Sequence, residues 1–213
     1  MLPISTKGCP PWTDDNRRNE SDFLLDCHQA HTAARAASTA QPLTTIQICN
    51  WHFVMCKRVA PSYYAGNFRQ IHPEMPCLAL PISFGSWSGA DASMVRPLVV
   101  EIIRRMELDF SDYDREWANM THEQRLRRFS LIVATLLGDF IRVHPFINAN
   151  GRTSRLLWSW ALARYGQPAQ CAIADRPAVP YADLMNLAVA QNYLPLAVAI
   201  LSGLNSQPKP PQT

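Results

Sequence analysis

The chain has 213 residues, of which 47% are hydrophobic and 17% are charged. This length suits one sizeable hydrophobic core and is short for two. The formal net charge of +3 is small, which excludes a surface built as a whole to bind nucleic acid or an acidic membrane. The chain has no long apolar run and no charged leader before an apolar segment, so we expect neither a membrane span nor a secretory signal.

Six cysteines are scattered along the chain without a C-x-x-C pair: Cys9, Cys27, Cys49, Cys56, Cys77 and Cys171. A domain of this size does not need disulfides, so we expect reduced thiols and a cytoplasmic location. Delivery as a secreted effector into a host cytosol is the alternative that the sequence leaves open.

Prolines and polar residues crowd both ends of the chain, and this composition predicts disordered tails. We expect residues 1–41 to be a tail that carries one helix of unknown role. Residues 205–213 are expected to be disordered. A single domain is expected between them, over residues 42–204.

The first helix is predicted within the N-terminal tail, with Ser21 as its N-cap. Its apolar positions fall at helical spacing: Phe23, Cys27, Ala30 and Ala34. A second helix is predicted to follow Pro42 and to end before Pro61. Its predicted buried face consists of Ile46, Cys49, Phe53 and Cys56.

Residues 63–89 contain too many prolines and glycines for a long helix. Two short apolar pieces in this stretch, CLAL (77–80) and PISF (81–84), are candidates to pair as a hairpin. We therefore expect a loop that carries a small β-ribbon.

Two long helical patterns follow. The first covers residues 95–106 and is expected to end in the polar segment 109–120, whereas the second has a broad apolar stripe and ends at Val143. The stripe consists of Phe129, Ile132, Val133, Leu136, Leu137, Phe140 and Ile141. A further helix is expected to end at Gly166, and one or two more follow Tyr181, the last with Pro195 in its first turn. Strand signals are sparse, so the predicted fold class is all-α.

The segment HPFINANGRTSR, residues 144–155, is a compact turn of small residues that enters a helix. Such a turn directs several backbone N–H groups the same way, and the helix dipole adds positive charge, so phosphate is the expected ligand. Gly151 is expected to permit a positive φ angle. Arg152 and Arg155 lie three residues apart on one helix face, where two guanidinium groups can donate hydrogen bonds to phosphate oxygens.

His144 immediately precedes the turn. An imidazole titrates near neutrality, so it can take a proton from a hydroxyl that attacks a bound phosphate ester. This is the chemistry of phosphoryl or nucleotidyl transfer, which usually needs a divalent ion held through a carboxylate. In this turn only Asn148 is placed to offer a side-chain oxygen to a metal.

These residues resemble the motif HPFx(D/E)GNGRxxR of the Fic (filamentation induced by cAMP) family. The fixed positions matched are His144, Pro145, Phe146, Asn150, Gly151, Arg152 and Arg155. The resemblance covers about residues 42–204 and includes a Gly-x-x-Arg turn from Gly66 to Arg69. Residues of about 70–86 stand where the family carries a target-docking flap. The resemblance implies a Fic-type helical bundle with a small β-hairpin flap.

The resemblance also implies an activity, that of a protein adenylyltransferase that moves AMP from ATP to a Ser, Thr or Tyr hydroxyl of a target protein. In that reading His144 is the catalytic base, and Asn150 and Gly151 form the pocket for the nucleotide phosphates. Arg152 and Arg155 bind the β- and γ-phosphates. Phe146 is implied to be the buried anchor of the loop, and Mg²⁺ to be the cofactor.

Two residues depart from the family pattern. Asn148 replaces the acidic residue that binds Mg²⁺, and Ala149 replaces a glycine. Loss of a full negative charge weakens the attraction for a metal, so we expect a weakened Mg²⁺ site and low or conditional activity. Two alternatives stay open: a degenerate module that binds nucleotide or a partner without transfer, and an enzyme that moves phosphocholine, UMP or phosphate.

Relatives are often inhibited by a helix with the pattern (S/T)xxxE(G/N), and no glutamate of this chain lies in that pattern. Either an antitoxin-like inhibitory protein therefore restrains this chain, or Asn148 already makes it weak. The other expected partner is a target protein with an acceptor hydroxyl. A homodimer is compatible with the sequence. Neither nucleic acid nor a membrane is expected as a partner.

The remaining histidines and tryptophans are expected to serve packing rather than chemistry. His28, His31, His52, His72 and His122 show no ligand spacing with one another or with the cysteines. Two tryptophans of the helix that follows the motif are expected to lie in the core: Trp158 and Trp160.

Overall fold

The computed structural model describes residues 8–12, 20–38, 42–169, 173–174 and 180–205. Within these ranges the chain forms seven α-helices: α1 (Ser21–Ala37), α2 (Thr45–Cys56), α3 (Val95–Glu116), α4 (His122–Val143), α5 (Asn150–Arg164), α6 (Tyr181–Val189) and α7 (Leu194–Asn205). Three short 3-10 turns also occur: Ser62–Tyr64, Pro76–Ala79 and Trp117–Asn119. The two strands β1 (Ser83–Phe84) and β2 (Trp87–Ser88) pair antiparallel. The all-α fold class is confirmed.

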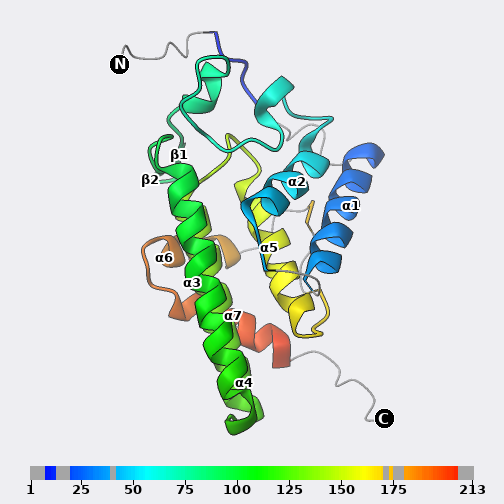
Figure 1. The fold of residues 1–213 in the computed structure, drawn as a ribbon, viewed down its shortest axis with the longest axis vertical. Helices are drawn as coiled ribbons and strands as arrows, with labels where there is room; N and C mark the ends of the chain where they lie inside the picture. Colours follow the sequence, from blue (N-terminus) through cyan, green and yellow to red (C-terminus); the bar gives the residue numbers. More distant parts are fainter. Residues whose placement is uncertain (1–7, 13–19, 39–41, 170–172, 175–179, 206–213) are drawn as a thin grey trace.

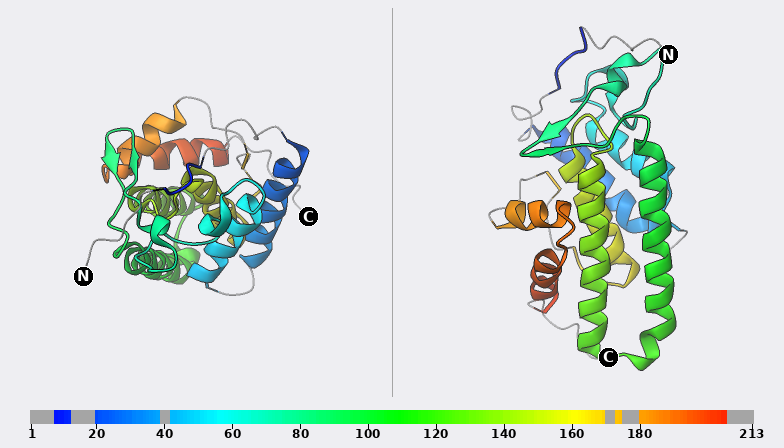
Figure 2. Two further views of the ribbon diagram at one scale, coloured as in Figure 1. Left: turned by 90° about the horizontal axis from the view of Figure 1, so that it is seen from above. Right: turned by 90° about the vertical axis from the view of Figure 1, so that its left-hand side faces the viewer.

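The long helices α3 and α4 run side by side and form the axis of the molecule (Figures 1 and 2). α5 packs against α4, and α1 and α2 cover α5. α6 and α7 pack on α4 from another side. The β1–β2 hairpin lies at the end of the bundle where α4 stops and α5 begins (Figure 1). Phe84 of β1 contacts His144, the first residue after α4.

The buried stripes of α1 and α4 agree with the sequence. All four predicted positions of α1 are buried, and so are all seven predicted positions of α4. The expected cap at Ser21 is wrong, because Ser21 is already helical and Glu20 occupies the N-cap without a side-chain hydrogen bond. Gly166 follows α5 with a φ of 67°, as expected of a helix stop.

The predicted buried face of α2 is wrong in part. Ile46 and Phe53 are 68% and 50% exposed, whereas the buried positions are Ile48, Trp51, His52, Met55 and Cys56. α2 is apolar on most of its circumference, so periodicity alone does not select a face. The face is decided by the partners of α2, which are α1 and α5.

The predicted hairpin pairing is also wrong. Residues 76–79 form a 3-10 turn that Pro76 opens, and the strands pair Ser83 with Ser88 and Phe84 with Trp87. The connection is the two residues Gly85 and Ser86, with Gly85 at a φ of 54°. Two-residue turns with a positive φ match the twist of paired strands, and a proline between CLAL and SF opposes the predicted register.

α3 extends further than the sequence indicated. It continues through the polar segment to Glu116 because Phe110 and Tyr113, three residues apart, prolong its buried stripe. The polar residues between them lie on the solvent side. A polar composition therefore marked an exposed face rather than the end of the helix.

The expectation of reduced thiols is wrong for two cysteines. Cys9 and Cys77, 68 residues apart, form a disulfide, whereas Cys27, Cys49 and Cys56 form none. Cys171 lies outside the described residues, as do residues 1–7, 13–19, 39–41 and 206–213 of the expected tails. Disulfides persist in oxidising compartments, so this pair removes the basis for the expected cytoplasmic location. No helix in the described ranges has the length and apolar composition needed to cross a membrane.

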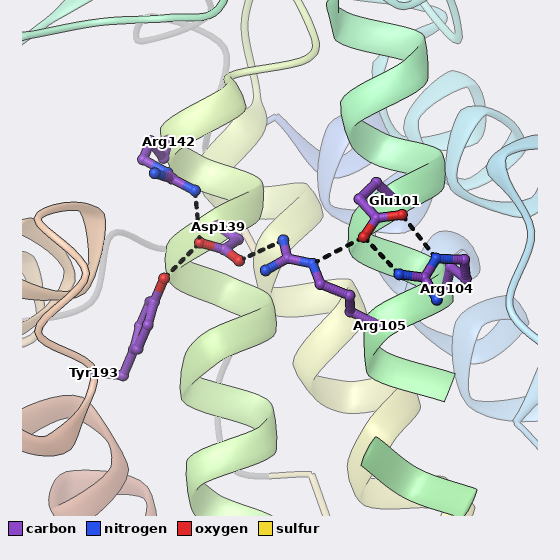
Figure 3. A network of polar contacts seen from close by, with 6 residues as sticks. All are labelled: Glu101, Arg104, Arg105, Asp139, Arg142 and Tyr193. Carbon is purple, nitrogen blue, oxygen red and sulfur yellow. Dashed lines mark hydrogen bonds and ion pairs between the residues drawn. The ribbon is translucent and has the colours of Figure 1, made fainter. Parts of the chain in front are cut away.

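A buried carboxylate secures the C-terminal part of α4 (Figure 3). Asp139 is 2% exposed and accepts hydrogen bonds from Arg105 of α3 at 2.9 Å, from Arg142 at 3.1 Å and from the Tyr193 hydroxyl at 2.6 Å. It thereby joins α3, α4 and the segment before α7. This cluster lies little more than one helical turn ahead of the end of α4.

We expect Asp139→Ala to lower the free energy of unfolding by about 2 kcal/mol, because it removes the shared acceptor of three donors whose other sides are partly solvated. Chemical denaturation monitored by circular dichroism measures this change. Asp112→Ala is the matched control, since Asp112 pairs with Arg115 on the exposed surface of α3 and such pairs contribute little. Equal effects of the two variants would contradict this prediction.

Candidate active site

His144 ends α4 in a left-handed conformation, with a φ of 52°. A residue before proline usually has an extended backbone, and His144 departs from this rule. The Nδ1 atom of His144 lies 3.2 Å from the carbonyl oxygen of Ile141. Because a carbonyl only accepts, we assign the ring proton to Nδ1, which leaves the lone pair on Nε2.

The imidazole of His144 is held neutral. Burial lowers the pKa of His144 to about 4, although the Ile141 carbonyl opposes the shift, and the Arg69 guanidinium lowers this pKa further. The Phe84 ring of β1 stacks on the imidazole, with ring centroids 4.1 Å apart and planes 15° from parallel. The hairpin therefore covers one face of this histidine.

Arg69 holds the backbone at His144 in place. Its side chain, in a residue that is 1% exposed, donates to four carbonyl oxygens: those of His144 at 2.8 Å, Ala90 at 2.6 Å, Val143 at 3.2 Å and Leu80 at 3.3 Å. Its own N–H donates to the carbonyl of Pro145 at 2.7 Å. Arg69 thus joins the end of α4 to both sides of the hairpin.

The loop after His144 is anchored by Phe146, which is fully buried. The ring of His52 stacks on Phe146 at 3.7 Å, almost parallel. The Asn150 side chain accepts from the N–H of Phe146 and donates to its carbonyl oxygen, both at 2.9 Å. The Asn150 amide is therefore engaged in holding the loop closed.

The left-handed residue of the turn is Ala149, with a φ of 62°. The positive φ expected at Gly151 is wrong, because Gly151 lies in the first turn of α5 and the conformational change occurs two residues earlier. A left-handed alanine costs about 1–2 kcal/mol, so the surrounding contacts must maintain this turn.

The first two turns of α5 carry both arginines of the motif. Arg152 and Arg155 are only 5% and 4% exposed. The guanidinium of Arg152 lies over the ring of Phe23 in α1, and that of Arg155 donates to the carbonyls of Gly151 and Ile173. Two guanidinium groups and a helix N-terminus at one place make the local potential positive.

These residues enclose a cavity of about 220 Å³. Its lining includes every residue that the sequence singled out for the site: His144, Asn148, Asn150, Gly151, Arg152 and Arg155. A larger cavity of about 800 Å³ lies near the N-terminal end of α4 and contains none of them. The small cavity is therefore the candidate active site.

Asn148 is held from two sides. Its Nδ2 atom donates to the carbonyl of Trp12 at 3.2 Å, and its Oδ1 atom accepts from the N–H of Ala149 at 2.6 Å. Its own carbonyl faces Nε2 of His52 at 3.2 Å. No cluster of three or more His, Cys, Asp or Glu side chains occurs in the part of the chain that the structure describes. One neutral amide oxygen, already hydrogen-bonded, is a poor fit for Mg²⁺, which favours carboxylates.

No motif in the sequence connects His52 or Trp12 with the site. The packing expected for His52 is confirmed, since it is fully buried. It also accepts from the N–H of Gly66 at Nδ1 and so donates from Nε2 to Asn148. A polar residue among apolar ones in α2 was the only signal for His52, and nothing in the sequence indicated Trp12. Trp158 and Trp160 lie in the core, as expected.

Comparison with known proteins gives two sequence matches. Residues 42–162, more than half of the chain, match the Fic/DOC family. A stretch of 68 residues is 34% identical to a protein of Xanthomonas campestris pv. campestris (strain 8004) named uridine 5'-monophosphate transferase. That stretch covers 30% of this chain and 13% of that protein, so the chain spans only a small part of this relative.

A solved structure resembles the fold. It is a Fic domain containing signaling protein from Bacteroides thetaiotaomicron VPI-5482, with a TM-score of 0.64 and 17% sequence identity. The superposition covers 86% of this chain and 70% of the other. At this identity the likeness concerns the helical fold alone.

Proposed function

The chain belongs to the Fic/DOC family, and from this premise we propose that it is a protein adenylyltransferase. In the proposed reaction the AMP moiety of ATP moves to a Ser, Thr or Tyr hydroxyl of a target protein. Transfer of a nucleotide or of another phosphate-linked group is the chemistry that family membership indicates. The observation that carries the proposal is a neutral His144 at the wall of a small, positively charged cavity.

His144 is the proposed general base. Its Nε2 lone pair takes the proton of the acceptor hydroxyl while the hydroxyl oxygen bonds to the α-phosphorus of ATP. The bond from the α-phosphorus to the bridging oxygen breaks, and pyrophosphate leaves. The hydrogen bond from Nδ1 to Ile141 fixes the ring and stabilises the imidazolium that forms.

The N-terminus of α5 is the proposed site of the phosphates. Helix geometry leaves the first N–H groups of α5 without intrahelical acceptors, and these groups attract anions. Arg152 and Arg155 supply the charge for the β- and γ-phosphates. Both guanidinium groups have protein contacts that a triphosphate would replace or share.

Mg²⁺, the cofactor implied by the resemblance, finds no carboxylate among the residues that line the cavity. We expect Asn148→Asp to lower the Mg²⁺ concentration needed for half-maximal transfer about tenfold, because added ligand charge raises affinity for a hard cation. Titration of Mg²⁺ at fixed ATP, with transfer of labelled AMP as the signal, measures this. Asn148→Ala is the control that removes the amide oxygen without adding charge. An unchanged Mg²⁺ requirement in Asn148→Asp would contradict the role of residue 148.

UMP is the second candidate for the transferred group. It is favoured by one observation, the match to a protein named uridine 5'-monophosphate transferase. Incubation with ATP and UTP, each labelled at the α-phosphate, separates the two donors, and the mass of the added group identifies it. His144→Ala is the control for both. Labelling from neither nucleotide by wild type would favour a module that binds without transfer.

The proposed acceptor is a protein that docks beside the hairpin. β1 and β2 form a two-stranded sheet, and an extended segment of a target can add to such an edge through backbone hydrogen bonds. Phe84 links this sheet to the catalytic histidine, so a docked segment would bring its hydroxyl toward His144. We also propose two further partners, an antitoxin-like inhibitory protein and a second copy of this chain.

A further inference from the structure

A short N-terminal segment, Gly8–Trp12, touches the candidate active site. It lies at the same end of the molecule as the β1–β2 hairpin (Figures 1 and 2) and precedes the part of the chain that matches the family. Cys9 is bonded to Cys77, and the Tyr64 hydroxyl donates to the carbonyl of Pro10 at 3.1 Å. The segment is therefore fixed at two points before it reaches the motif.

Trp12, the last residue of the segment, contacts Asn148. The carbonyl oxygen of Trp12 accepts a hydrogen bond from Nδ2 of Asn148. The Trp12 ring packs edge-on against His52, with ring centroids 5.9 Å apart, and it also packs against Tyr64 at 6.2 Å. His52 in turn donates to the backbone carbonyl of Asn148. Asn148 is thus held at its side chain by Trp12 and at its backbone by a histidine on which Trp12 packs.

The contact with Trp12 requires an amide at position 148. Asn148 uses its oxygen for the N–H of Ala149 and its nitrogen for the carbonyl of Trp12. A carboxylate has no N–H to donate, so it would place an oxygen against the Trp12 carbonyl oxygen. Asn148, one of the two residues that depart from the family pattern, is therefore the residue that the N-terminal segment binds.

We propose that Gly8–Trp12, secured by the Cys9–Cys77 disulfide, is a positioning element that orders Asn148 and the loop between α4 and α5. The disulfide makes this ordering sensitive to thiols. A dithiol reductant supplies two electrons and two protons, the bond between Cys9 and Cys77 breaks, two thiols form, and the reductant is left as a disulfide. Cys9 is partly exposed and offers the route of attack.

Release of the segment should increase the fraction of time in which the loop between α4 and α5 is open. Without the disulfide, the contacts of the segment with other described residues are the hydrogen bonds at Pro10 and Trp12 and the packing of Trp12. The cross-link keeps the segment at a high effective concentration near its site. Loss of one hydrogen bond of ordinary strength changes an opening equilibrium about fivefold.

Hydrogen exchange measured by mass spectrometry tests the proposal on the full chain. We expect peptides that cover residues 144–151 to exchange about fivefold faster after treatment with dithiothreitol. The double variant Cys9→Ser/Cys77→Ser should show the fast rate without reductant and should not respond to it. Asn148→Asp keeps the size of the side chain and loses the donor to Trp12. Residues 144–151 of this variant should therefore exchange fast before reduction, and dithiothreitol should change their exchange rate little.

Three results would overturn the proposal. One is an unchanged exchange rate of residues 144–151 in reduced wild type, another is a full response in Asn148→Asp, and the third is equal acceleration in peptides from the middle of α3. Only the consequence for activity rests on the proposed function, which predicts slower transfer after reduction. Absence of transfer in every redox state would count against the proposed function and leave the exchange result intact.

Discussion

Replacement of His144 by alanine is expected to lower the rate of nucleotidyl transfer about a thousandfold, the scale that a positioned general base contributes. The binding of nucleotide should change much less, because the α5 N-terminus and the two arginines remain. Transfer of α-labelled nucleotide measures the rate, and equilibrium titration with the nucleotide measures the binding. A residual rate close to that of wild type would remove His144 from the mechanism.

The pH dependence of His144 provides a second test of the same assignment. The neutral imidazole is the active form, and its pKa of about 4 lies below the ordinary value of 6.5 because the ring is buried. In the free protein the neutral fraction should therefore stay high as the pH falls to about 5. A bound polyphosphate favours the imidazolium, so the acid limb of kcat should lie at higher pH than that of kcat/KM.

An NMR titration of the ring protons in the free protein measures this pKa without interference from the nucleotide. His144→Ala identifies the signal, since six histidines are present in the chain. A midpoint near 6.5 would contradict the described burial of the ring. It would also predict that kcat/KM falls between about pH 6.5 and pH 5, where a pKa of about 4 predicts little change.

Replacement of Arg69 by methionine is expected to be the most destabilising single change at the site. It leaves four carbonyl groups without the guanidinium that binds them, and we expect a loss of about 3 kcal/mol in the free energy of unfolding. The backbone at His144 would shift, and a displacement of about 1 Å at a catalytic group costs roughly a hundredfold in rate. Chemical denaturation and the transfer assay measure the two effects.

Two further variants separate position from charge at Arg69. Arg69→Lys keeps the positive charge beside His144 but cannot reach four acceptors at once, so the rate should fall while the pKa of His144 stays low. Arg69→Met removes the repulsion, so the pKa of His144 should rise, although burial still holds it below 6.5. Arg115→Met, at an exposed position on α3, should leave stability and rate nearly unchanged. Equal behaviour of Arg69→Met and Arg115→Met would refute the positioning role.

Local patterns in the sequence determined the helical class of the fold and predicted where the candidate site lies. The stripe of α4 repeats over a long helix, so its buried face follows from periodicity. His144, Asn150, Arg152 and Arg155 stand within twelve residues of one another. Residues so close in the sequence stay close in space, so the motif alone predicted that they meet, and they line one cavity.

Packing between distant segments decided the rest. α2 is apolar on most sides, so only its neighbours select the face with His52. The left-handed backbone at His144 depends on Arg69, and the orientation of Asn148 depends on Trp12, 136 residues away. A disulfide between residues 68 apart holds Trp12 near the motif. Contacts of this kind leave no periodic trace in a sequence, because their geometry exists only once the helices have packed.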